Sequence, residues 1–211
     1  MNPSQGLSSR DAGVLNLLFD LEAQPSLEDS NLIDQTTPDQ PLNAEQLAEV
    51  KVIEQRAIQL AEEGAIDEAE KLLTRTIRKY PNERPSLWSN RAQVRRLSKN
   101  VPGALDDLSQ TIRIATPPEN ATPSNDNAKI LSFAYTHRAT IYMLAAKGEI
   151  SGVLNGESHE QLERYASHDF AMAGKYGSGL ARAMAVRTNP YAKICGAIVQ
   201  TALKKEMQPL V

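Results

Sequence analysis

The sequence predicts an all-α protein: a short right-handed α-solenoid of three helical hairpins followed by C-terminal capping helices. Apolar residues recur at helical spacing from Leu47 onward. The order of helix, tight turn, helix and stop is then repeated, with Ala69 and Ala104 thirty-five residues apart. Near the C-terminus, an apolar stripe is backed by polar residues, which is typical of a helix that closes a repeat stack.

Residues 1–46 are expected to stand apart from a helical domain at 47–211. Apolar residues at the spacing of one helix face predict a short amphipathic helix near 9–22. Its apolar face consists of Val14, Leu17, Leu18 and Leu21. A flexible acidic linker follows, because residues 24–45 are rich in Pro, Asp, Gln and Ser and have few large apolar groups. Two placements of the short helix stay open: it occupies the groove of the domain, or it packs outside and extends the stack.

The first two repeats are expected near 50–83 and 85–116. In the first, the apolar spacing breaks at Gly64, resumes, and ends at Pro81. This predicts two helices joined by a tight turn and a stop. The second repeat has the same layout, and Trp88 lies near the start of its first helix.

The third repeat is expected near 132–176 and is split by an insertion near 148–158. Its first helix is predicted over 132–149 and its second over 165–175. A long polar loop at 116–127 precedes it. Both added segments lie between elements, where extra length costs little free energy.

Two capping helices are expected over 178–207. Asn189 is placed to cap the second of them, and Pro190 stands at the favoured first helical position. The apolar stripe of this helix consists of Tyr191, Ile194, Cys195, Ile198, Val199, Ala202 and Leu203. We expect the stripe to cover the last face of the stack, and Cys195 to be buried and inert, since apolar burial raises the pKa of a thiol.

The period of about 34 residues, with small residues where helices cross, is typical of tetratricopeptide hairpins. Two segments are more specific: "SNRAQVRRLSKNVPGALDDL" (89–108) and "NPYAKIC" (189–195). With them, the chain resembles the tetratricopeptide repeat protein 36 family over about 10–22 and 47–207. The resemblance implies a helical repeat domain that binds protein partners, and association with the seventy-kilodalton heat-shock chaperone.

Charged residues recur at two fixed places of the repeat. The seventh and twenty-third positions hold opposite charges in the second and third repeats, which predicts two structural ion pairs between the helices of a hairpin. These pairs are Arg91 with Asp107 and Arg138 with Asp169. The first repeat has Arg56 at the seventh place but Leu72 at the twenty-third, so it lacks the partner.

A partner-binding groove is expected along the first helices of the repeats. By register its residues are Ile58, Ser89, Asn90, Gln93, Arg96, Phe133, Thr136, His137 and Thr140. This mixed lining suits a helix or extended peptide with apolar anchors. In tetratricopeptide proteins that grip a chaperone's C-terminal carboxylates, a set of Lys, Asn and Arg residues forms a clamp, and only Asn90 matches it here. The chaperone implied by the resemblance should therefore bind another surface.

Three basic residues lie at the end of the helix that begins near Trp88, and two interpretations of their role stay open. Arg95, Arg96 and Lys99 form either a solvated face that suits the helix dipole or a cationic patch for an acidic segment. The chain's own acidic residues 20–45 are one candidate for that segment.

The sequence contains no motif of an enzyme or of a metal site. The three histidines lack metal-ligand spacing and no nucleophile motif is present, so we expect no enzyme, no metal and no cofactor. We expect a non-catalytic interaction protein; the alternative is a structural subunit of a larger helical assembly. A large exposed apolar patch on the closing helix would favour that alternative.

Charge and hydropathy indicate the compartment. Residues 1–45 have one arginine against eight carboxylates, so residues 46–211 carry +4 of a total of −3, too little for a dedicated nucleic-acid binder. No apolar run is long enough to span a bilayer, and the single cysteine fits a reducing compartment. We expect a cytoplasmic protein, with the nucleus as a second location, that binds neither nucleic acid nor membrane.

Overall fold

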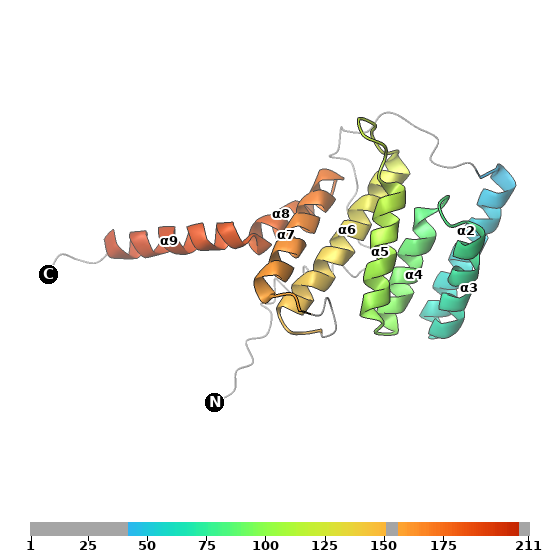
Figure 1. Ribbon diagram of the computed structural model, residues 1–211, viewed down its shortest axis with the longest axis horizontal. Coiled ribbons are helices and arrows are strands. Elements are labelled where there is room, and N and C mark those ends of the chain that lie inside the picture. The colour runs from blue at the N-terminus through green and yellow to red at the C-terminus, as the bar shows by residue number, and fades with distance from the viewer. Residues whose placement is uncertain (1–41, 151–155, 207–211) are drawn as a thin grey trace.

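The computed structural model describes residues 42–150 and 156–206, and these ranges contain helices and no strand (Figure 1). The all-α class is therefore confirmed. From α2 to α8, each helix packs against the next one along the chain. The eight helices of the described ranges are α2 (Ala44–Glu62), α3 (Ile66–Lys79), α4 (Pro85–Leu97), α5 (Val101–Ala115), α6 (Asn125–Ala146), α7 (His159–Lys175), α8 (Gly179–Thr188) and α9 (Pro190–Glu206).

Side-chain caps fix where several helices begin. At α2, the Gln46 N–H donates to Asn43 Oδ1 at 2.8 Å, and the Asn43 N–H donates to Gln46 Oε1 at 3.1 Å. Ser158 and Gln161 form the same capping box at α7. These bonds satisfy N–H groups that the first turn of a helix leaves without a partner. The turn from α2 to α3 contains Gly64 at a φ of +82°, a conformation that glycine adopts at little cost.

The buried hydrophobic residues form three clusters along the series of helices. One joins α2, α3 and α4, and the next joins α4, α5 and α6. In the second cluster, Ala92 and Ala104 are buried, and their small side chains let α4 and α5 approach closely. This is the role expected of small residues where two helices cross.

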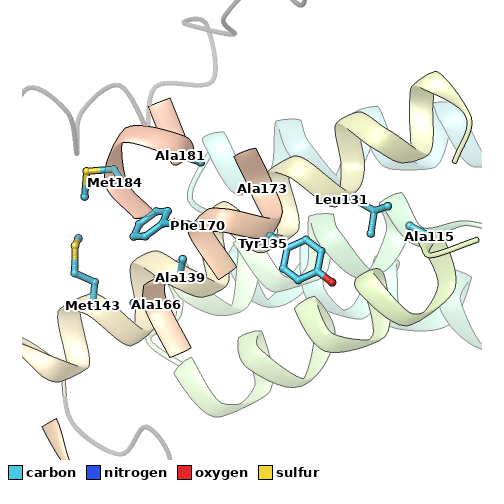
Figure 2. Packing of buried hydrophobic residues seen from close by; sticks show 10 residues of the cluster. All are labelled: Ala115, Leu131, Tyr135, Ala139, Met143, Ala166, Phe170, Ala173, Ala181 and Met184. Carbon is cyan, nitrogen blue, oxygen red and sulfur yellow. The ribbon is translucent and has the colours of Figure 1, made fainter. Parts of the chain in front are cut away.

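The third cluster joins α6, α7 and α8 and includes Ala115 at the end of α5; Figure 2 shows the side chains of this cluster. Phe170 is its largest fully buried side chain. Gly174 lies where α7 meets α8: a Cβ there would come within 2.3 Å of Arg182 Cγ. These contacts attach α8 firmly to the preceding pair.

The first helix of the third pair begins earlier than the sequence indicated. The prediction placed it over 132–149, after a loop at 116–127, whereas α6 spans Asn125–Ala146. Ser124 accepts a hydrogen bond from the Asn127 N–H at 3.1 Å and so caps a helix inside a stretch that reads as a polar loop. Leu131 is buried in the added turns, which explains why they are helical.

The closing role expected of the last helix is wrong in this structure. Asn189 and Pro190 do start α9, and the Tyr191 N–H donates to Asn189 Oδ1 at 2.9 Å. However, α9 projects away from α7 and α8, as Figure 1 shows, and its apolar stripe is exposed. Cys195, which we expected to be buried, is exposed as well. The stripe is amphipathic as predicted, but no described helix covers it.

Two expectations fall outside the described residues. The helix expected near 9–22 and the acidic linker lie within residues 1–41. Part of the insertion expected near 148–158 lies at residues 151–155.

Candidate functional site on helices α2, α4 and α6

The α4–α5 pair is joined by a buried ion pair. Arg91 Nε lies 2.9 Å from Asp107 Oδ2, and Arg91 Nη2 lies 2.7 Å from Asp107 Oδ1. Both side chains are buried, and Arg91 Nη1 also donates to Thr74 Oγ1 of α3 at 3.1 Å. The guanidinium carbon is 4.9 Å from the centre of the Trp88 ring. All three guanidinium nitrogens of Arg91 therefore have a partner within the protein, and the side chain joins three helices.

Arg95 belongs to the same network, which the sequence did not reveal. Its Nε lies 2.8 Å from Glu70 Oε1 and its Nη1 lies 3.1 Å from Asp107 Oδ1. Nη1 also donates to the Gly103 carbonyl at 3.2 Å. Of the two readings for the cations at the end of α4, neither holds for Arg95, because it is an internal structural group. The sequence signal for this contact is Glu70 near the start of α3, whose carboxylate pairs with Arg95.

The α6–α7 pair has the matching ion pair. Arg138 Nε lies 2.6 Å from Asp169 Oδ2, and Arg138 Nη2 lies 3.0 Å from Asp169 Oδ1. Arg138 Nη1 donates to Ser109 Oγ of α5 at 3.2 Å. Burial works against the charged guanidinium, but the hydrogen bonds and charge of Asp169 outweigh it, so the pKa of Arg138 is raised.

The α2–α3 pair lacks this bridge, as its sequence predicts. Arg56 contacts only Glu63 among the ion pairs of the described residues, at 3.6 Å, and both side chains are more than half exposed. A different buried carboxylate lies on α2: Glu54 contacts Arg84 and accepts a hydrogen bond from Ser86, at the start of α4. Glu54 thus takes part in the attachment of α2 to the next pair.

The predicted groove residues lie on α2, α4 and α6 and differ in exposure. Ile58 on α2 is exposed. The partly buried ones are Asn90, Gln93, Arg96 and Phe133, and the buried ones are Ser89, Thr136, His137 and Thr140. The last four are 5%, 7%, 7% and 2% exposed, so in this structure they do not offer an open contact surface.

The two threonines are satisfied within their own helix. The hydroxyl of Thr136 donates to the Ser132 carbonyl at 2.8 Å, and that of Thr140 donates to the Thr136 carbonyl at 2.8 Å. Such bonds leave little hydrogen-bonding capacity for a partner. Their place on the helix agrees with the register, but direct recognition by their hydroxyls does not follow.

His137, Phe133 and Arg96 bring α4 and α6 together at this face. The rings of Phe133 and His137 lie 4.0 Å apart between centres. Burial, and next the positive charge of Arg96, lower the pKa of His137 from 6.5 to about 3. Burial also lowers the pKa of Arg96. At neutral pH the buried imidazole of His137 is therefore uncharged and lies beside the ring of Phe133.

Within the described residues, no group of three or more His, Cys, Asp and Glu side chains could hold a metal ion. None of the helices among them is both long and apolar enough to cross a membrane. The side chains of the predicted groove that are not buried are an apolar residue, two amides, a guanidinium and an aromatic ring.

Comparison with known proteins decides the family. A protein of Drosophila pseudoobscura pseudoobscura, the "Tetratricopeptide repeat protein 36 homolog", is 30% identical, and the alignment covers 93% of this chain and 94% of that protein. This chain belongs to the tetratricopeptide repeat protein 36 family. The Danio rerio member of the family is 27% identical, with 97% of each chain covered. The resemblance seen in the sequence is thereby confirmed.

A fungal protein is similar as well. The "L-tyrosine degradation gene cluster protein hmgX" of Aspergillus fumigatus is 32% identical, with all of this chain and 98% of that protein covered. No protein-family model matches the chain, and no solved structure does. The family names agree with an all-helical protein of the tetratricopeptide type and with a role in protein interaction.

Proposed function

We propose that this member of the tetratricopeptide repeat protein 36 family is a non-catalytic adaptor that binds a peptide or helix of a partner protein. Its domain at 47–211 is proposed to be a short right-handed solenoid with repeats near 50–83, 85–116 and 132–176. In this arrangement α8 caps the stack. The observation that carries the proposal is the recurrence of one buried Arg–Asp bridge in two successive helix pairs, as expected of repeated hairpins.

The proposed contact surface is the face of α2, α4 and α6 that carries the partly exposed predicted residues. We call it the recognition face, and its residues are Ile58, Asn90, Gln93, Arg96 and Phe133. Ile58 and Phe133 supply apolar anchors, while the amides and Arg96 supply polar contacts that set orientation. Because the arginines of the bridges are already used internally, they take no part in recognition.

Two candidates for the partner follow from the family. The seventy-kilodalton heat-shock chaperone is one, bound without a carboxylate clamp, since only Asn90 fits that pattern. The name of the Aspergillus relative connects that protein with L-tyrosine degradation. We therefore propose enzymes of L-tyrosine degradation as the second candidate class. We place the interaction in the cytoplasm or the nucleus.

The test is affinity capture with matched variants, followed by calorimetry on the purified partner. Phe133→Ala and Arg96→Ala change the recognition face. Arg75→Ala makes the same change as Arg96→Ala at an exposed position of α3, and Val186→Ala removes an exposed apolar side chain of α8. We expect both face variants to lose one shared partner, with a Kd at least tenfold weaker, and both controls to keep it. Unchanged capture by the face variants would reject the proposal.

A second candidate function is a structural subunit of a larger helical assembly. One observation favours it: the exposed apolar stripe of α9. Sedimentation of the purified chain decides this point, because such a subunit would associate with itself or with its neighbours through that stripe. A stable monomer over a wide concentration range opposes the second candidate.

A further inference from the structure

The apolar stripe of α9 contains five of the ten large hydrophobic residues that are exposed in the described part of the chain. Its five large members are each more than half exposed: Tyr191 70%, Ile194 57%, Ile198 63%, Val199 57% and Leu203 52%. They recur on one side of a 17-residue helix. A soluble protein rarely leaves so many neighbouring apolar side chains in water, so the stripe calls for a covering segment.

The charge of the chain is divided between its two ends. Residues 179–206 contain five lysines and arginines against one glutamate, whereas residues 1–41 contain one arginine against seven carboxylates. Opposite net charges of this size attract over roughly 10 Å at moderate ionic strength. The basic end of the chain is also the end that has the uncovered apolar stripe.

The N-terminal residues supply an apolar face of the right kind. Val14, Leu17, Leu18 and Leu21 repeat at the spacing of one helix side, within a segment that also contains Asp11 and Asp20. If an amphipathic helix of this pattern packed on the stripe of α9, the apolar side chains of both helices would be buried against each other. Their pairing would form a two-helix unit beyond α8.

The tether is long enough for this contact. The twenty-one residues 23–43 join the segment to α2 and span up to about 70 Å when extended. Packed helices are separated by about 8–10 Å. Each helix from α2 to α8 packs against the next, so six such steps at most separate α2 from α8, or about 60 Å. The extended tether therefore reaches from α2 to the far end of the helix row, where α9 begins.

We propose that residues 9–22 of the same chain dock as a helix on the apolar stripe of α9. The proposal chooses the outer of the two placements left open by the sequence, and it leaves the recognition face to a partner. It also accounts for the exposure of Cys195, because the stripe that contains this residue is completed by a segment distant in sequence. The proposal does not depend on the proposed partner binding.

Disulfide formation with Cys195 tests the proposal in the full chain. Cys195 is the only cysteine, so a second one introduced in the segment can form a single intramolecular bond. The variants are Leu17→Cys and Leu18→Cys on the apolar side, and Asn16→Cys on the opposite side as the matched control. We expect at least one apolar-side variant to close its disulfide at least tenfold faster than Asn16→Cys, at dilute concentration.

A second measurement uses the native thiol alone. We expect Leu17→Asp combined with Leu18→Asp to speed the reaction of Cys195 with a maleimide at least fivefold, with unchanged helical circular dichroism and thermal unfolding. Equal closure rates for all three cysteine variants, together with an unchanged maleimide rate, would overturn the proposal. Disulfides that form mainly between chains, or maleimide protection that grows with protein concentration, would also overturn it, because they assign the stripe to a second copy.

Discussion

The α4–α5 and α6–α7 pairs use the same bridge in different surroundings. In both, an arginine forms two hydrogen bonds to an aspartate on the following helix. Asp107 receives a second arginine, Arg95, whereas Asp169 has one arginine and the exposed His168 at 3.2 Å. The side chain of Arg91 is 9% exposed and that of Arg138 is 18% exposed. The Arg91–Asp107 bridge, which we call the inner bridge, is therefore more deeply buried than the Arg138–Asp169 bridge, which we call the outer bridge.

The residues that precede the two arginines differ as well. Asn90 precedes Arg91 and is partly exposed, whereas His137 precedes Arg138 and is buried. The difference shows how two helix pairs can keep the same bridging residues while the residue just before the arginine varies. A histidine occupies that position in only one of the two pairs.

The largest expected effect is at the inner bridge. Asp107→Ala leaves Arg91 buried without its carboxylate and should lower the free energy of unfolding by about 3–5 kcal/mol. Urea denaturation measures the loss. Arg91→Met combined with Asp107→Leu is the control, because replacing both charges by apolar groups should recover most of it. An equal loss in the single and double variants would show that the bridge itself is not what the single variant breaks.

At the outer bridge the effect should be smaller. Asp169→Ala leaves Arg138, which is more exposed and keeps its bond to Ser109, so we expect a loss of about 2 kcal/mol. The same urea titration measures it. A loss larger than that of Asp107→Ala would reverse the ranking of the two bridges.

The stability of the fold should also depend on pH through His137, which lies in the α6–α7 pair and has no counterpart in the α4–α5 pair. The pKa of His137 is about 3 when folded and 6.5 ordinarily, so between these values the unfolded chain binds the proton more strongly. Above about pH 7.5 the titration of His137 does not lower the free energy of unfolding. As the pH falls below this value, the free energy of unfolding decreases, by about 2 kcal/mol at pH 5.

His137→Asn, which places the side chain of the α4 equivalent on α6, removes this titration. We expect the variant to lose less stability than the parent chain between pH 7.5 and pH 5, as measured by urea denaturation at each pH. Identical pH profiles for the two chains would contradict the assigned pKa.

The smallest effect is expected in the pair that lacks the bridge. Arg56→Ala removes an exposed contact to Glu63 and should change the free energy of unfolding by no more than about 0.5 kcal/mol. Thermal unfolding compared with the parent chain measures it. A shift as large as that of Asp169→Ala would mean that Arg56 takes part in a stabilising bridge, against the assignment for this pair.

The helices and the bridges could be predicted from sequence because both depend on local spacing. Opposite charges at two fixed repeat positions identify partners on adjacent helices, and the pairing of Arg91 with Asp107 follows from that register. The start of α6 could not be placed, since the cap at Ser124 lies within a segment whose composition is that of a loop.

What remained beyond the sequence depends on contacts between distant elements. The apolar spacing of α9 predicts a helix with an apolar side, but not whether that side meets α8 or leaves it. The depth of burial of His137 and Thr140 likewise depends on how neighbouring helices cross. Register assigns these residues to a face, and packing decides how much of each stays exposed.

In the proposed adaptor, the bridges position the helices while the recognition face contacts the partner. Calorimetry of the purified partner with Phe133→Ala, and with the Arg91→Met, Asp107→Leu double variant, separates these two roles. We expect a Kd at least tenfold weaker for Phe133→Ala, with unchanged thermal unfolding, and an unchanged Kd for the bridge variant. A weaker Kd in the bridge variant alone would overturn this division of roles.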